Sequence, residues 1–246
     1  MGLSQPKQFE MLHGKTVLEH SVDTFEKHPK IDGIFVVVHE DFLENTKRLL
    51  HVRNRPKIVG VIAGGAERMD SSRNAILAVS TVVSRASTTG TISATSTISA
   101  TGTVTEALEV TDCNLLIHDA ARPFITEKII TDTVDALKTR TAVSVAIPAT
   151  DTVYICNNNE IQSSPKRETV YLAQTPQGGR LSVLKRAFAL TLREPQRPAQ
   201  NDLSVAEALE ATDDACVILH HLPDEKIHIV LGDVANRKIT FQSDLL

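Results

Sequence analysis

The chain has 246 residues, of which 41% are hydrophobic and 23% charged, and its formal net charge at pH 7 is −4. This composition is typical of a soluble globular protein and excludes a general electrostatic attraction to nucleic acid or acidic lipid. Tryptophan is absent and aromatic residues make up 4%, which argues against a stacking surface for single-stranded nucleic acid. The three cysteines lie far apart and favour a reducing cytoplasm. No apolar stretch reaches the length of a membrane span.

Helical and extended patterns alternate through the first 150 residues. The spacing of apolar residues predicts helices over 14–27, 41–50, 71–83 and 126–137. Apolar, β-branched runs predict strands over 34–38, 58–62, 114–118 and 142–148. This alternation indicates a three-layer α/β domain with a mostly parallel sheet, and the whole chain, 1–246, is predicted to be a single domain.

Three later segments depart from this rhythm. Residues 84–105 are a Ser/Thr/Ala-rich stretch that carries too little apolar mass to pack, so we expect a disordered insertion. Residues 151–177 contain two short β-rich runs, 152–155 and 168–172, separated by three asparagines, which predicts a projecting β-arm. Residues 193–201 hold two prolines and are predicted to form a loop, and a last strand is expected over 226–231.

Charged residues follow the predicted strand at 114–118. Asp119 could bind a divalent ion or a hydroxyl group, and the planar guanidinium of Arg122 suits a phosphate. Ligands of open α/β sheets bind beyond the carboxyl ends of the strands, which is where both residues fall. An Asp–Arg pair that merely caps the loop explains the pattern about equally well.

Two glycines, Gly64 and Gly65, separate a predicted strand from a predicted helix. Glycines let a backbone approach a ligand closely, and helix N-termini favour anions. Ser71 is expected to be either part of this site or a helix N-cap. Lys7 could neutralise a polyphosphate, although its position alone favours an exposed terminal lysine.

Other charged and hydroxyl residues fall in predicted loops, where such side chains are usually solvated. They include Lys166, Arg167, Thr175, Asp213, Asp214, Arg237 and Lys238. His220 and His221 are adjacent in a predicted strand and would face opposite sides, so they predict no metal site. No nucleophile elbow or zinc motif is present.

The order of these motifs resembles that of one enzyme family. PKQF, GKTVLEH, GG-x-x-R-x-x-S, HDAARP, P-x-x-DT, QTPQ, TDDA and N-x-KIT follow one another along the chain. This order is similar to that of the 2-C-methyl-D-erythritol 4-phosphate cytidylyltransferases and the related ribitol-5-phosphate cytidylyltransferases. The resemblance covers residues 1 to about 244, apart from the 84–105 insertion and part of 192–210, and implies a Rossmann-like nucleotidyltransferase fold.

The resemblance implies that CMP is transferred from CTP to a sugar-alcohol phosphate, with release of pyrophosphate and a requirement for Mg²⁺. Lys7 resembles a lysine on the triphosphate, and Lys238 resembles a catalytic lysine on the α-phosphate and the incoming phosphate. The nucleotide-binding segment that resembles the cytosine reader comprises Gly64, Gly65, Ala66 and Ser71.

Asp119 and Arg122 resemble the pair that binds the acceptor. Further acceptor-binding residues are implied on the arm, namely Thr152, Arg167 and Thr175. In the family the arm clasps a second subunit and donates its arginine across the interface, which implies a homodimer. Asp119 or Asp213 would be the metal ligand.

The chain also departs from the family pattern. The family begins with a central strand and a glycine-rich loop ahead of the segment that matches residues 2–9, and neither is present here. We expect the two strands beside that position to lack a partner. Gly179 stands where an aromatic residue is usual, which is expected to loosen the packing beside the arm.

Four functions stay open on these grounds. The first is transfer to methylerythritol phosphate in isoprenoid synthesis, and the second is transfer to ribitol 5-phosphate, which the tail at 216–225 favours. The third is a catalytically silent subunit, because of the missing loop. The fourth, more distant, is a nucleotidyltransferase that uses UTP or GTP.

Overall fold

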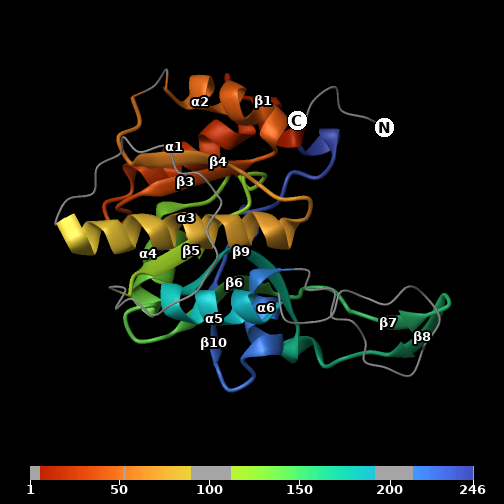
Figure 1. Cartoon of the computed structure of the whole chain (residues 1–246). Helices are drawn as coiled ribbons and strands as arrows, with labels where there is room; N and C mark the ends of the chain where they lie inside the picture. The colour runs from red at the N-terminus through yellow and green to blue at the C-terminus, as the bar shows by residue number, and fades with distance from the viewer. Residues whose placement is uncertain (1–5, 52–53, 90–111, 192–212, 246) are drawn as a thin grey trace.

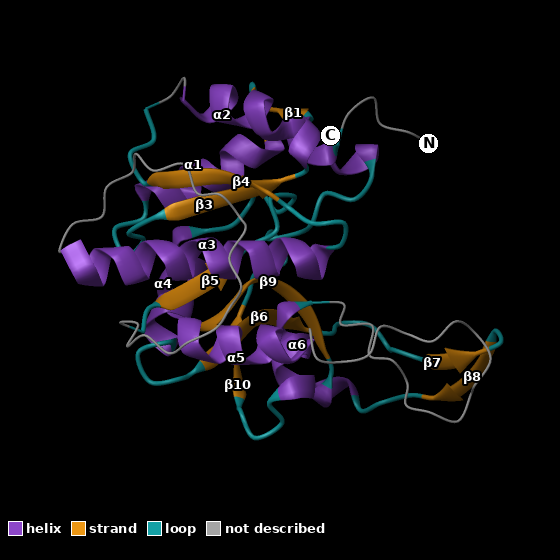
Figure 2. Ribbon diagram, viewed as in Figure 1, coloured by secondary structure: helices purple, strands orange, loops and turns teal. Residues whose placement is uncertain are grey.

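The computed structural model describes residues 6–51, 54–89, 112–191 and 213–245, with the side chains of 85–89 excepted. Helices and strands alternate along most of this chain, and helices lie on both sides of the strands (Figures 1 and 2). The α/β class expected from the sequence is therefore confirmed. None of the described helices is long and apolar enough to cross a membrane.

The main sheet has four strands in the order β10-β6-β9-β5. These strands are β5 (Asn114–Ile117), β6 (Ala142–Pro148), β9 (Tyr171–Arg180) and β10 (Ile227–Leu231). β10 pairs with β6 in parallel, whereas β9 runs antiparallel to both β6 and β5. Three of the four strands therefore point the same way, but two of the three strand pairs are antiparallel because β9 runs against both of its neighbours.

β9 was not predicted as a strand over its full length, because Pro176, Gly178 and Gly179 disfavour an inner strand. The glycines are needed there because the neighbouring strands come very close. A Cβ at Gly178 would lie 2.4 Å from the Leu115 carbonyl oxygen, and one at Gly179 would lie 2.9 Å from that of Thr141. Gly179 is buried, so the loosened packing that we expected at this position is not what the structure has.

Two further strands, β3 (Ile34–Val38) and β4 (Ile58–Ala63), form a separate parallel pair. In the described part of the chain, neither β3 nor β5 pairs with a second neighbour, so the strands form two sheets where the sequence suggested one. Helix α3 (Arg68–Thr89) contacts β3, β4 and α5 (Leu181–Thr191), and so connects both sheets (Figure 1).

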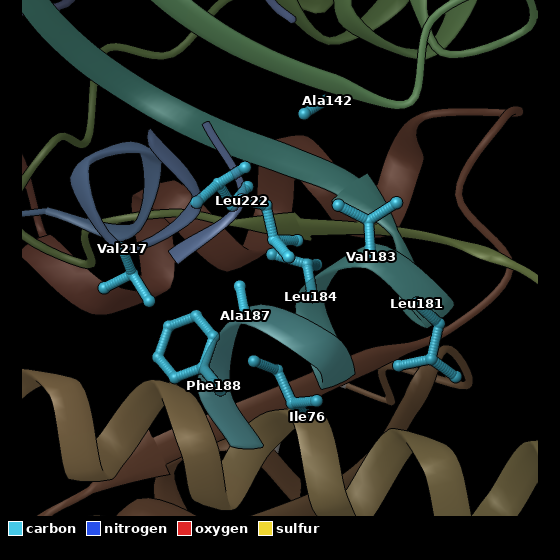
Figure 3. Packing of buried hydrophobic residues seen from close by; sticks show 10 residues of the cluster. Ile76, Ala142, Leu181, Val183, Leu184, Ala187, Phe188, Val217 and Leu222 are labelled. Atoms are coloured by element: carbon cyan, nitrogen blue, oxygen red, sulfur yellow. The ribbon is translucent and has the colours of Figure 1, made fainter. Parts of the chain in front are cut away.

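Apolar helix faces cover the main sheet. Figure 3 shows Phe188 of α5 close to Ile76 of α3 and Val217 of α6 (Asp214–His221), in a cluster that covers one face. A second cluster joins α4 (Glu127–Ala136) to β6 and β10. Helix α1 (Val17–Lys27) begins with a capping box in which Thr16 and Glu19 bond each other's backbone N–H groups.

The predicted arm is a hairpin that projects from the body (Figure 2). It consists of β7 (Ile155–Asn157) and β8 (Glu160–Ser163), joined through Asn158 and Asn159. Both turn residues have positive φ, 48° and 64°, as a two-residue hairpin turn requires. The prediction that 168–172 supplies the second strand was wrong, because the chain forms a 3-10 turn at Arg167–Thr169 and then enters β9.

Several smaller expectations also changed. Residues 84–89 continue α3, and the remainder of the predicted insertion lies outside the described residues, as does the loop predicted at 193–201. His220 and His221 end α6 and do not lie in a strand. The remaining elements are short: η1 (Lys7–Phe9), β1 (Met11–Leu12), β2 (Lys15–Thr16), η2 (Glu40–Phe42), α2 (Leu43–His51) and η4 (Gln242–Leu245).

Candidate active site

The loop after β5 is held by hydrogen bonds from the buried end of β9. The Asp119 amide donates to Thr175 Oγ1 at 3.1 Å, and this hydroxyl lies 3.0 Å from His118 Nδ1. The other ring nitrogen of His118, Nε2, lies 3.1 Å from the carbonyl oxygen of Arg122. Because a carbonyl can only accept, Nε2 carries the proton and Nδ1 accepts from the threonine. Burial lowers the pKa of His118 to about 4, which keeps the ring neutral.

Asp119 lies at the centre of a group of cations. Its Oδ2 is 2.9 Å from Lys238 Nζ and 3.8 Å from Arg122 Nε, and its Oδ1 is 3.9 Å from Arg68 Nη2. Burial alone would raise the pKa of Asp119, but Lys238, Arg68 and Arg122 outweigh it and lower that pKa. The carboxylate is therefore ionised at neutral pH.

Lys7 belongs to the same group. Its pKa is lowered by burial and by the charge of Lys238, and Asp119 opposes this effect. The structure thus brings together Lys7, Lys238, Asp119 and Arg122, which the resemblance assigned to the triphosphate and the acceptor. We call these four residues and Arg68 the charged cluster.

Arg122 is fixed by backbone carbonyls. Its Nη1 donates to the Asn236 carbonyl at 2.8 Å and its Nη2 to that of Ala173 at 3.3 Å. Asn236 is itself fully buried and donates through Nδ2 to Gln174 Oε1 and the Thr175 carbonyl. These bonds tie the segment that carries Lys238 to β9 and to the loop after β5.

The predicted nucleotide segment forms a tight turn before α3. The Gly65 amide donates to Ser71 Oγ at 3.1 Å, and the Ser71 hydroxyl donates to the Glu67 carbonyl. A Cβ at Gly65 would lie 2.1 Å from Asp70 Cβ, and one at Gly64 would lie 2.6 Å from Ser71 Oγ. The helix itself therefore requires glycine at position 65, whereas a side chain at position 64 would displace the Ser71 hydroxyl. Since α3 begins at Arg68, Ser71 lies within the helix and is not its N-cap, and Ala66 is exposed beside it.

Arg68 connects this turn to the charged cluster and was not singled out from the sequence. Its Nη2 lies 2.7 Å from Asp214 Oδ2 as well as 3.9 Å from Asp119 Oδ1. The sequence signals were the arginine of GG-x-x-R-x-x-S, which was quoted only as part of that motif, and Asp214 of TDDA, which was named only as a charged residue in a predicted loop.

The structure separates the three predicted arm residues. Thr175 is buried in β9 and bonds the loop after β5. Thr152 and Arg167 are exposed at the base of the arm, where Arg167 Nη1 donates to the Thr150 carbonyl. No contact between these two residues and the charged cluster is found in the described part of the chain. The structure therefore does not place these two predicted acceptor residues beside the charged cluster of the same chain.

The carboxylates do not form a protein-held metal site. Asp213 is the N-cap of α6, where its Oδ1 accepts from the Cys216 amide and its Oδ2 from Gln177 Nε2. Asp119 already accepts from Lys238. Within the described ranges, no group of three or more His, Cys, Asp or Glu side chains is arranged to hold a metal ion.

Comparisons with known proteins agree with this geometry. The profile of the 2-C-methyl-D-erythritol 4-phosphate cytidylyltransferase family (IspD) matches residues 1–86 and 94–246. The unmatched residues 87–93 fall in the Ser/Thr-rich stretch. The chain is 33% identical over its full length to the cytidylyltransferase of that name from Thermobifida fusca, of which it covers 85%.

Two further similarities bear on function and fold. The chain is 33% identical to a bifunctional ribulose 5-phosphate reductase/CDP-ribitol pyrophosphorylase from Haemophilus influenzae, but spans only 44% of that protein. A solved 4-diphosphocytidyl-2C-methyl-D-erythritol synthase from Anaerococcus prevotii superposes with a TM-score of 0.71 over 96% of this chain and 85% of that one. At 24% identity this likeness shows the fold. The chain belongs to the 2-C-methyl-D-erythritol 4-phosphate cytidylyltransferase family of enzymes.

Proposed function

We propose that the chain transfers CMP from CTP to the phosphate of a sugar alcohol, with release of pyrophosphate. The observation that carries this proposal is the charged cluster, in which four cationic side chains surround one carboxylate beside the glycine turn. A triphosphate and an acceptor phosphate together carry several negative charges. A site that excludes part of the solvent and presents cations suits them.

The proposed reaction needs positioned charge more than covalent chemistry. An oxygen of the acceptor phosphate attacks the α-phosphorus of CTP, the new P–O bond forms, and the bond to the bridging oxygen of pyrophosphate breaks. Lys238, whose side chain is 41% exposed, would stabilise the charge on this phosphorus, and Lys7 would hold the triphosphate. Asp119 and Arg122 would orient the acceptor. Positioning and charge stabilisation of this kind account for most catalysis of phosphoryl and nucleotidyl transfer.

2-C-methyl-D-erythritol 4-phosphate is the acceptor that we propose. The family profile and the Thermobifida fusca relative carry this name. Ribitol 5-phosphate is the second candidate, because the Haemophilus influenzae relative is named for CDP-ribitol. Both acceptors present one phosphate and several hydroxyl groups to the same charged cluster.

Mg²⁺ is proposed as a cofactor that enters with CTP. Magnesium is commonly held by substrate phosphates and one or two carboxylates. Of the two predicted carboxylates, Asp119 belongs to the charged cluster, whereas Asp213 caps α6 and accepts from Gln177 and Cys216. Bound to the phosphates, the ion would neutralise part of their charge. No step of the mechanism is assigned to it.

We propose a homodimer formed through residues 151–177, because this arm exposes apolar side chains. Five large apolar or aromatic side chains there are 46–60% exposed: Tyr154, Ile155, Ile161, Tyr171 and Leu172. Apolar patches of this kind mark protein interfaces. In such a dimer, Arg167 of one protomer would be available to the acceptor of its partner. Multi-angle light scattering on the wild type and on Ile161→Ser would test this, because the proposal expects a dimer that the substitution weakens.

The function is tested by pyrophosphate release from CTP and Mg²⁺ with each acceptor in parallel wells. Release with methylerythritol phosphate alone supports the first acceptor, and release with ribitol 5-phosphate alone supports the second. UTP and GTP in place of CTP test the choice of base. No release with any pair, from a protein whose circular dichroism shows it folded, would favour the silent-subunit alternative and refute the proposal.

A further inference from the structure

Arg68 joins three segments that are far apart in the sequence. It is the first residue of α3, directly after the glycine turn, and its Nη2 faces Asp214 at the start of α6 and Asp119 in the loop after β5. Arg68 therefore follows the proposed nucleotide segment in the chain, and its guanidinium lies beside the proposed acceptor loop and the start of α6.

Asp214 serves as an anchor for Arg68 and not as a ligand for substrate. It is 1% exposed, so a substrate cannot reach its carboxyl group. Burial raises the pKa of Asp214, and Arg68 and Ser72 oppose that rise. A buried carboxylate needs a partner of opposite charge, so Asp214 fixes the guanidinium at 2.7 Å.

Arg68 approaches the oxygen of Asp119 that Lys238 does not contact, at 3.9 Å, which is an electrostatic approach and not a hydrogen bond. Lys238 and Arg122 face Oδ2, whereas Arg68 faces Oδ1. When Lys238 turns to a phosphate group, Arg68 stays beside this carboxylate because Asp214 anchors it. Both distances are measured from the same Nη2 atom, which is hydrogen-bonded to Asp214 at 2.7 Å and lies 3.9 Å from Asp119, and the charge of the guanidinium is delocalised beside both carboxylates.

We propose that Arg68 is a positioning residue that Asp214 anchors and that holds Asp119 ready for the hydroxyl groups of the acceptor. This inference rests on the proposed function, since it assigns Asp119 to the acceptor. Arg68 thereby links the conformation of the nucleotide turn to the conformation of the acceptor loop. It acts through Asp119 and makes no contact of its own with the reacting atoms.

The test compares Arg68→Gln, Arg68→Lys, Asp214→Asn and the Arg68→Gln/Asp214→Asn double variant in the full chain. Arg73→Gln is the matched control. Arg73 lies on the same helix and forms an ion pair with Asp70 at 3.0 Å, outside the charged cluster. We expect Arg68→Gln to raise the KM for the acceptor about 10-fold, the range for loss of a charged hydrogen bond. The KM for CTP should change less than about 3-fold, and Arg68→Lys should recover part of the loss.

Two further measurements separate positioning from general stability. The double variant should be no worse than Arg68→Gln alone, because both substitutions break the same chain of contacts. Amide exchange of residues 118–123, measured by mass spectrometry without substrate, should quicken in Arg68→Gln and not in Arg73→Gln.

An unchanged acceptor KM, an equal rise in both KM values, or additive losses in the double variant would overturn the inference. If the wild type transfers no CMP, the proposed function fails by itself. The exchange measurement then still decides whether Arg68 orders the acceptor loop. Asp214→Asn and Arg68→Lys keep the size of each side chain, so they provide the comparison if Arg68→Gln does not fold.

Discussion

His118 makes the stability of the protein depend on pH. An unfolded histidine titrates near 6.5, whereas burial lowers the pKa of His118 to about 4 in the folded protein. Between these two values the unfolded chain binds more protons, so the free energy of unfolding falls as the pH falls. Linkage with the two pKa values gives a loss of about 2 kcal/mol between pH 7 and pH 5. The loss is nearly complete near pH 4 and absent above pH 7.

Urea denaturation followed by circular dichroism at pH 7, 6 and 5 measures this loss. In His118→Gln the amide can still donate to the Arg122 carbonyl, but the titrating group is gone. We expect the fall in unfolding free energy between pH 7 and pH 5 to shrink by about 2 kcal/mol relative to the wild type. His228→Gln, on the exposed face of β10, is the control and should leave the fall unchanged. Equal falls in the wild type and His118→Gln would refute the argument that burial controls this histidine.

Three other substitutions test the charges. Lys238→Ala should lower kcat about 10²–10³-fold. It should lower the free energy of unfolding by at most about 1 kcal/mol, because the ion pair of Lys238 is partly exposed. Lys226→Ala, at an exposed lysine, is the control in the pyrophosphate assay. Arg55→Met should cost about 3–5 kcal/mol in urea denaturation, because it leaves Glu19 and Asp23 without their buried partner. Lys7→Met should weaken CTP binding about 10-fold by calorimetry while the apo protein unfolds no more readily, since burial and Lys238 already disfavour the Lys7 charge.

The sequence predicted the elements whose signals are local. The helix at 126–137 appears as Glu127–Ala136 and the strand at 142–148 as Ala142–Pro148, because a threonine cap and a continuous apolar run mark them. β9 was not predicted over its full length because what makes it a strand is its contact with neighbouring strands, which the local sequence does not show. Gly178 and Gly179 look like a break until the backbones of β5 and β6 lie on either side of them. The second arm strand was misplaced for a related reason, since a two-residue turn at Asn158–Asn159 brings Glu160–Ser163 into register first.

The candidate site also divides into residues that the sequence indicated and residues whose place depends on the fold. Asp119, Arg122, Lys7 and Lys238 were found because each belongs to a motif whose order along the chain resembles a family. Their shared location is set by the topology: Lys238 comes 119 positions after Asp119 in the sequence, and yet the two side chains lie 2.9 Å apart. Thr175 was placed on the arm, but the structure buries it beside the loop after β5. A motif says which residue types occur together, and it does not say which of them support the others.

Arg68 illustrates what only the fold can add. In the sequence it is one of 26 cationic Lys and Arg residues, and an arginine in the first turn of a helix opposes the helix dipole. A cation at a position that is unfavourable for the helix needs a compensating partner. The buried carboxylate of Asp214 is that partner, and its Oδ2 lies 2.7 Å from Arg68 Nη2. Arg73, one turn further along α3, has its partner on the same helix. The difference between the two arginines is that the contacts of Arg68 are long-range, and this is the property that lets one side chain connect the two halves of the proposed site.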